Sequence, residues 1–129
     1  MHYMLLFHDT SAEAGKRNDP AQADAYWGGW TAYIGAIAQS GAMVSGNGLQ
    51  PPDVATTVRV VNGERQVVDG PFADTKEMLA GYVIVDVADL DGALEWASRA
   101  PCVTGARSRS APCSRRPAPD GSRAPRCRL

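Results

Sequence analysis

The stretch from Gly105 to Leu129 limits what this chain can fold into, because it supplies almost nothing to a hydrophobic core. Between Thr104 and Leu129 there is no large aliphatic side chain, and arginine, serine and proline recur. Seven arginines face one acid there, a net charge of +6, whereas residues 1–104 carry six basic groups against thirteen acids, a net −7. Such a composition predicts disorder. We therefore expect one folded domain over residues 1–104 and a disordered basic tail over residues 105–129.

Residues 1–104 alternate between strand-like and helix-like patterns. Trp27, Trp30, Ile34 and Ile37 form one apolar stripe at helical spacing, and Asn62-Gly63 favours a tight hairpin turn. The expected segments, in chain order, are a buried strand at 2–8, a loop at 10–18, a helix at 20–40, a strand at 42–45, a hairpin of 56–61 with 66–68, a strand at 81–87 and a helix capped by Asp89. This order predicts an α+β domain.

A domain of this order needs one more strand after its second helix, and the sequence does not provide it. We expect the first strand, residues 2–8, to keep an unpaired edge that invites aggregation. One explanation is a shift of reading frame near residues 105–107. Plausible GC-rich codons for Arg107 to Arg116, read from the last base of the first codon, translate as Val-Glu-Val-Arg-Pro-Val-Leu-Pro-Pro, an alternating strand with a proline stop. The nucleotide sequence decides this hypothesis.

The run from Asp69 to Glu77, Asp-Gly-Pro-Phe-Ala-Asp-Thr-Lys-Glu, concentrates charge at a turn. Aspartate, glycine and proline are turn residues, and Phe72 is most simply a core plug, so turn chemistry explains most of the run. The functional interpretation makes Asp69 and Glu77 acid–base groups at the mouth of a cleft, with Lys76 as an anion clamp or pKa modifier. Asp69, Lys76 and Glu77 are the candidate catalytic residues.

Two further groups of residues allow both a structural and a functional interpretation. His8 and Asp9 end the first strand and could act as a base, but neighbouring strand residues point to opposite faces, and an exposed strand end is the simpler expectation. Tyr26, Trp27, Trp30 and Tyr33 could line an aromatic ligand pocket, although helical spacing is more typical of a core or dimer contact.

Several classes of function receive no support from the sequence. No apolar run is long enough for a membrane span, and the first residues have no basic leader or apolar core of a secretory signal, so we expect a cytoplasmic protein. The three cysteines and two histidines have no spacing typical of zinc. Gly46-Asn47-Gly48 lacks the third glycine of a dinucleotide fingerprint. We expect no metal, no cofactor and no nucleic-acid partner.

Several separated motifs, in order, resemble those of YCII-related, or DGPF-domain, proteins. The motifs are Tyr3-Met4-Leu5-Leu6, Gly48-Leu49-Gln50-Pro51-Pro52, the run from Asp69 to Glu77, Gly81-Tyr82 and the helix from Asp89 to Ala97. The resemblance covers about residues 1–104 and implies a ferredoxin-like α+β fold that pairs with a second copy into a dimeric α+β barrel. Family members typically finish with a valine-rich strand, from which this chain departs.

The resemblance leaves the function open between classes. Some relatives carry a histidine on the first helix, thought to act with an aspartate, but residues 20–40 contain no histidine. The first hypothesis is a homodimeric protein that binds a small molecule or acts as an acid–base enzyme. The alternative is a non-catalytic regulatory or accessory dimer associated with an extracytoplasmic-function sigma factor. A third is a damaged copy with little function.

Overall fold

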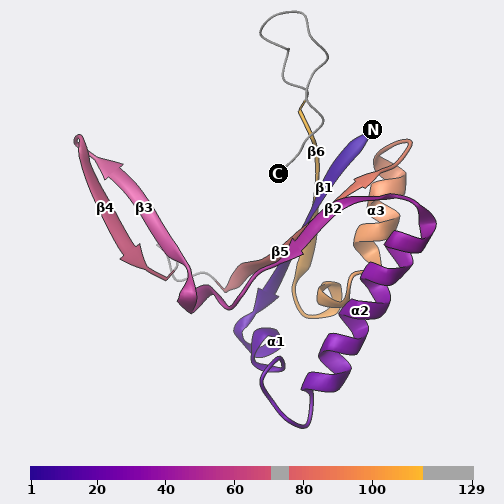
Figure 1. Ribbon diagram of the computed structural model, residues 1–129, viewed down its shortest axis with the longest axis horizontal. Coiled ribbons are helices and arrows are strands. Elements are labelled where there is room, and N and C mark those ends of the chain that lie inside the picture. Colours follow the sequence, from indigo (N-terminus) through magenta and orange to yellow (C-terminus); the bar gives the residue numbers. More distant parts are fainter. Residues whose placement is uncertain (71–75, 115–129) are drawn as a thin grey trace, which may run out of the picture.

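The computed structural model describes residues 1–70 and 76–114, and it is a two-layer α+β domain with an appended hairpin (Figure 1). The strands are β1 (His2–Thr10), β2 (Met43–Gly48), β3 (Thr56–Val61), β4 (Glu64–Asp69), β5 (Glu77–Asp86) and β6 (Arg107–Pro112). The helices are α1 (Ser11–Gly15), α2 (Ala23–Ser40) and α3 (Leu90–Ser98), with short 3-10 turns at Pro52–Val54 and Pro101–Thr104.

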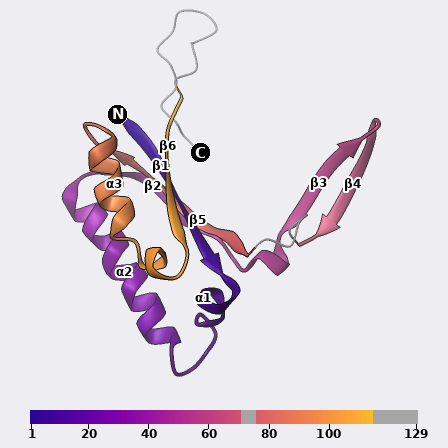
Figure 2. The same cartoon turned by 180° about the vertical axis from the view of Figure 1, so that it is seen from behind.

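Four strands form one antiparallel sheet in the order β2-β5-β1-β6, so β1 is a central strand. The chain runs β-α-β, then the hairpin, then β-α-β, which is the element order expected of a ferredoxin-like domain. Both long helices, α2 and α3, cover the same face of this sheet (Figures 1 and 2). The expected α+β class is therefore confirmed.

Two of the expected helix ends are confirmed, but α2 begins at Ala23 and not at residue 20 as expected. Asp89 accepts a hydrogen bond from the Gly92 backbone N–H at 3.0 Å and so caps α3. Gly41 ends α2 in a left-handed conformation, with φ of 81°. Asp19 and Gln22 do bond to each other, at 2.6 Å, but in a turn that precedes the first residue of α2. The predicted loop at 10–18 instead contains α1, capped by the Thr10 hydroxyl.

The core lies between the sheet and the two helices, and β1 supplies its centre. Burial alternates along β1: Tyr3, Leu5 and Phe7 are buried against the helices, whereas the residues between them are half-buried on the other face. Ile37 of α2 and Val85 of β5 are fully buried beside them. Burying a side chain of this size contributes roughly 1.5–3 kcal/mol.

The prediction that no strand follows α3 is wrong. Residues Arg107–Pro112 form β6, which pairs antiparallel with β1 from Tyr3↔Pro112 to His8↔Arg107. The physical reason is that ladder hydrogen bonds come from the backbone, which any non-proline residue provides, and an open β1 edge is costly. The prediction of disorder, which was based on composition, is therefore wrong for residues 107–112. The rest of the expected tail, residues 115–129, lies outside the described residues.

The strand β6 is poorly matched to the core it covers. Ser108 pairs with Phe7 and Ser110 with Leu5, so both serines lie on the helix-covered face. Their hydroxyl oxygens are buried and have no hydrogen-bond partner among the described residues. A buried hydroxyl without a partner costs free energy. Backbone pairing holds this strand despite its side chains.

The hairpin β3–β4 forms a separate two-stranded sheet that projects away from the four-stranded sheet (Figures 1 and 2). Its turn is the expected Asn62-Gly63, with φ of 52° and 79°. Its strands are exposed on both faces except for a half-buried Thr57. Among residues 1–70 and 76–114, no helix combines the length and apolar character needed to cross a bilayer.

Candidate functional site

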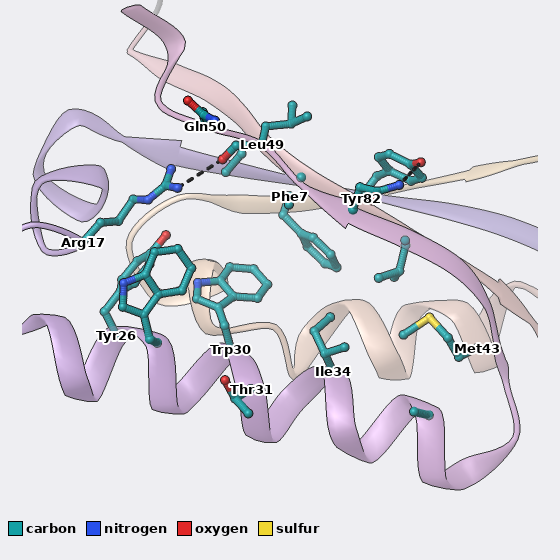
Figure 3. Close-up of a pocket in the computed structure, with 18 residues that line it drawn as sticks. Phe7, Arg17, Tyr26, Trp30, Thr31, Ile34, Met43, Leu49, Gln50 and Tyr82 are labelled. Carbon is teal, nitrogen blue, oxygen red and sulfur yellow. Dashed lines mark hydrogen bonds between the residues drawn. The ribbon is translucent and has the colours of Figure 1, made fainter. Parts of the chain in front are cut away.

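An aromatic groove of about 770 Å³ lies between α2 and the β2–β5 side of the sheet (Figure 3). From α2, Tyr26, Trp30 and Ile34 point from the helix toward the strands. Phe7 and Tyr82 come from β1 and β5, and Leu49 with Gln50 lies at one end. We call this space, with these lining residues, the aromatic groove.

The inner wall of the aromatic groove is rigid because its rings pack edge to face. Phe7 and Trp30 have ring centroids 5.0 Å apart at an interplanar angle of 62°. Tyr33 packs behind both rings and donates its hydroxyl hydrogen to the Trp96 carbonyl at 2.8 Å. Edge-to-face pairs of this kind contribute roughly 0.5–1.5 kcal/mol beyond simple burial. The wall is thus preformed.

A bulge in β5 fixes the backbone at the open end, or mouth, of the groove. Phe7 pairs with Gly81 but His8 pairs with Leu79, so Ala80 is the extra residue on β5. The Ala80 carbonyl accepts a hydrogen bond from the Leu49 backbone N–H at 2.8 Å. Gly81 permits the close approach of β2, because a Cβ there would lie 2.9 Å from the Asn47 carbonyl oxygen. The segment after β2 is therefore fixed beside the groove.

Arg17 spans the same mouth from the turn before α2. Its guanidinium lies over the Trp27 ring, 5.1 Å from the centroid, and donates a hydrogen bond to the Leu49 carbonyl at 3.1 Å. Figure 3 shows this bond as a dashed line beside Gln50. The cation lies at one end of a space that is otherwise uncharged and largely apolar.

The buried carboxylate of Asp9 lies behind Tyr26. Asp9 is 4% exposed, and its Oδ2 accepts a hydrogen bond from the Tyr26 hydroxyl at 2.8 Å. Its Oδ1 is buried with no partner among the described residues. Burial raises the pKa of Asp9, partly offset by the bond from Tyr26. Burial and the same bond raise the pKa of Tyr26, which stays protonated at neutral pH.

A smaller cavity of about 320 Å³ lies on the other side of this pair. Asp9, Tyr26 and Trp30 line it, together with Glu13 and Lys16, which form an ion pair at 2.9 Å. Tyr26 and Trp30 also line the aromatic groove, so they form the wall between the two spaces. Asp9 and Tyr26 thus form an acid–base pair between two cavities.

The three predicted catalytic residues lie elsewhere. Asp69 is the exposed last residue of β4, and Lys76 is exposed just before β5. Glu77, the first residue of β5, pairs with the Arg107 Nε at 3.0 Å. Lys76 and Glu77 are neighbours, but none of the three is among the residues that line the two cavities above. The intervening residues 71–75, with Phe72, Asp74 and Thr75, lie outside the described part of the chain. The catalytic role of Asp69, Lys76 and Glu77 stays a prediction.

The structure corrects the expectation of an exposed strand end at His8-Asp9. The two side chains do point to opposite faces, but Asp9 faces the helices and is buried. His8 is half-buried on the other face, and burial followed by the nearby Arg107 lowers its pKa. The sequence signal for the burial of Asp9 is the alternation of β1, which places Asp9 on the same face as Tyr3, Leu5 and Phe7.

The aromatic residues of α2 divide between the two roles that the sequence left open. Tyr33 belongs to the core, at 6% exposure, whereas Tyr26, Trp27 and Trp30 line the aromatic groove. In residues 1–70 and 76–114, no cluster of three or more histidine, cysteine, aspartate or glutamate side chains could hold a metal ion.

Comparison with known proteins identifies the chain's relatives. The family model of the YCII-related domain matches residues 1–110. An uncharacterised protein of Rhizobium meliloti (strain 1021) is 51% identical over 49 residues, which is 38% of this chain and 40% of that protein. The chain thus spans less than half the length of this curated relative. Among solved structures, 5-chloro-2-hydroxyhydroquinone dehydrochlorinase from Burkholderia phenoliruptrix AC1100, in complex with 2,5-dihydroxybenzoquinone, is 14% identical, with a TM-score of 0.49 over 89% of this chain and 95% of that one.

Proposed function

The chain belongs to the YCII-related family, and we propose that it binds a small molecule with a flat apolar body in the aromatic groove. The observation that carries this proposal is the preformed groove of about 770 Å³ between α2 and the sheet. Ligand sites are typically concave, of 300–1,000 Å³, and lined by aromatic and aliphatic side chains with a few polar groups. Phe7, Trp27 and Trp30 supply the apolar contact, and Tyr26 supplies a polar group at the wall.

The pair of Asp9 and Tyr26 gives this site a means of moving a proton. A ligand N–H or O–H group that reaches Tyr26 donates its hydrogen to the phenolic oxygen, while the Tyr26 proton passes to Asp9. The ligand loses one proton and Asp9 gains one, and the reverse step returns it. A raised pKa suits a carboxylate for this task, because it brings the group closer to neutral operating pH. The proposal therefore includes acid–base chemistry.

The binding proposal is tested by tryptophan fluorescence and titration calorimetry with a panel of small aromatic and aliphatic compounds. Trp27 is 46% exposed at the groove, so Trp27→Ala should preserve the fold and weaken binding of any groove ligand roughly tenfold, about 1.4 kcal/mol. Leu94→Ala on α3 removes a similarly exposed apolar side chain, at 45%, outside the groove and serves as the control. Equal affinity of both variants for every bound compound would contradict the site.

The proton step is tested by the visible absorbance of bound 4-nitrophenol in mildly acidic buffer, because proton exchange from the ligand to Asp9 shifts its absorption to longer wavelength. Asp9→Asn should retain ligand binding and abolish proton exchange, because the amide cannot accept the proton. Asp69→Asn, at the predicted catalytic turn, should leave the exchange unchanged. The opposite pattern would move the acid–base group to the turn that contains Asp69.

We also propose that the protein is a homodimer that pairs through the sheet face opposite α2 and α3. No helix of the described residues covers that face in one chain (Figures 1 and 2), and it carries the half-buried apolar side chains of Met4 and Leu6. Leu6→Lys should therefore yield a monomer by light scattering after gel filtration. Leu94→Lys on α3 is the control, and an unchanged mass for both would contradict this surface.

An accessory role beside a sigma factor stays a prediction. None of the contacts seen among residues 1–70 and 76–114 favours it.

A further inference from the structure

The charge of the aromatic groove indicates which molecules it selects. Eighteen of the described residues line it, and Arg17 is the only one of these eighteen with a formal charge at neutral pH. The wall also carries the uncharged polar side chains Thr31, Asn47 and Gln50, and Tyr26, whose raised pKa keeps it protonated. A largely apolar space with one cation at one end is complementary to a ligand that has a flat apolar body and one negative charge.

The geometry of Arg17 leaves most of its hydrogen-bonding capacity for a ligand. A guanidinium has five N–H donors, and the structure shows one hydrogen bond, to the Leu49 carbonyl. The Trp27 ring beneath it and this bond hold the guanidinium at the groove mouth. A planar fork of donors suits a carboxylate, which it can bind through two parallel hydrogen bonds.

The acidic side chains near Arg17 are engaged elsewhere. Among residues 1–70 and 76–114, no carboxylate forms an ion pair with Arg17. Glu13 pairs with Lys16, and Asp9 accepts the Tyr26 hydroxyl hydrogen. The positive charge of Arg17 slightly lowers the pKa of Asp9, but burial raises that pKa more. A ligand anion would therefore meet an uncompensated cation.

We propose that the groove ligand is a planar aromatic monoanion of the arenecarboxylate class. Its ring lies against Trp30 and Phe7, and its carboxylate is bound by Arg17 at the mouth. This proposal rests on the function proposed above and specifies its ligand class. A neutral arene has no negative charge to pair with Arg17. A phosphate ester with several negative charges would leave all but one of them unpaired, because Arg17 is the one cation among the described lining residues.

The test compares 2-naphthoate with 2-naphthamide, which have the same shape and differ in charge. Binding to the full chain is followed by tryptophan fluorescence and calorimetry at pH 7.5 in low salt. The wild type should bind naphthoate at least about tenfold more tightly than naphthamide. Arg17→Gln should remove that preference by weakening naphthoate alone, and Arg17→Lys should retain part of it.

Arg99→Gln is the matched control. Arg99, just after α3, lies over the Trp96 ring at 4.5 Å and forms the same kind of pair, and neither residue lines the groove. This variant should preserve the preference for naphthoate. The comparison of the two ligands on the wild type needs no variant to fold.

Each outcome decides between the class of ligand and the site itself. Equal binding of both ligands, or a preference for naphthamide, overturns the anionic class and leaves the groove as a binding site. Equal weakening of both by Arg17→Gln also overturns it, since the arginine then acts through packing on Trp27. Binding of neither ligand at millimolar concentration, with no response in the wider compound panel, overturns the proposed function as well.

Discussion

Single side chains carry the chemistry of this molecule, and Asp9 shows how strongly position alters one. The same aspartate at the end of an exposed strand would be an ordinary solvated carboxylate. Buried on the helix-covered face of β1, it retains one hydrogen bond from Tyr26 and an oxygen with no partner among the described residues. Burial disfavours the charged form, so its pKa rises.

This shift predicts how stability depends on pH. The unfolded chain has an aspartate pKa of about 3.9, and the folded value is higher. Folded protein therefore binds more protons between the two values, so the contribution of Asp9 to stability is full below the unfolded pKa and is lost as pH rises through the folded pKa. Asp9→Asn should remove this loss, raising the melting temperature at neutral pH relative to wild type.

The control for that measurement is Asp19→Asn. Hydrogen bonds from the Ala21 backbone N–H and the Gln22 side chain lower the pKa of Asp19, so its contribution has the opposite sign and is lost as pH falls through its folded pKa. Melting curves from about pH 3 to pH 8 separate the two. An Asp9→Asn variant whose melting temperature follows the wild-type pH profile would contradict the assignment.

Cys102 provides a second prediction about one side chain. It is 1% exposed, and burial raises its pKa to about 11. Little thiolate forms at pH 8, so in a variant with Cys113 and Cys127 changed to serine the remaining thiol should react with a disulfide reagent at least about a hundredfold more slowly than in denaturant. Rapid reaction of the native variant would show that this part of the core opens readily.

At the scale of elements, β6 is the strand whose side chains and environment disagree. Ser108 and Ser110 face the core with buried hydroxyls that have no partner among the described residues. In the shifted reading frame considered above, two valine codons overlap mainly codons 108 and 110. The inward positions of β6 are thus those at which the hypothesis supplies the aliphatic residues that the sheet lacks.

We predict that Ser108→Val and Ser110→Val each stabilise the protein by roughly 1–2 kcal/mol. Each removes a buried hydroxyl that has no hydrogen-bond partner and adds a β-branched side chain to a strand. Urea unfolding gives the free energies. Ser114→Val, at an exposed position just after β6, should change stability by no more than about 0.5 kcal/mol. Destabilisation by the two inward valines would mean that the strand is overpacked.

Elements with local signals could be predicted from the sequence, and those held by distant contacts could not. The α2 stripe, the Asp89 cap and the Asn62-Gly63 turn each depend on residues a few positions apart. By contrast, β6 depends on the open edge of β1, far away in sequence, and its own residues give no strand signal. For the same reason the sequence did not predict the pairing of Asp9 with Tyr26, which lies on another element.

For the whole molecule, the sheet is complete only when β6 is present. A chain that ends after Ser114 should keep the melting temperature within about 2 °C of the full chain, since residues 1–114 contain all four strands of the main sheet. A chain that ends after Ala106 should aggregate, because β1 then presents an apolar edge. Light scattering and thermal unfolding measure both. A stable, monodisperse shorter chain would show that β6 is dispensable.

The central place of β1 also has a consequence for how the protein is made. β1 leaves the ribosome before the other strands, yet its neighbours are β5 and β6, and Leu5 pairs with Ser110 about a hundred residues later. During translation the apolar strand β1 therefore has no strand to pair with while the residues of the helices and the hairpin are being synthesised. Such long-range pairing slows folding, so we expect nascent chains to depend on ribosome-associated chaperones until the last strand emerges.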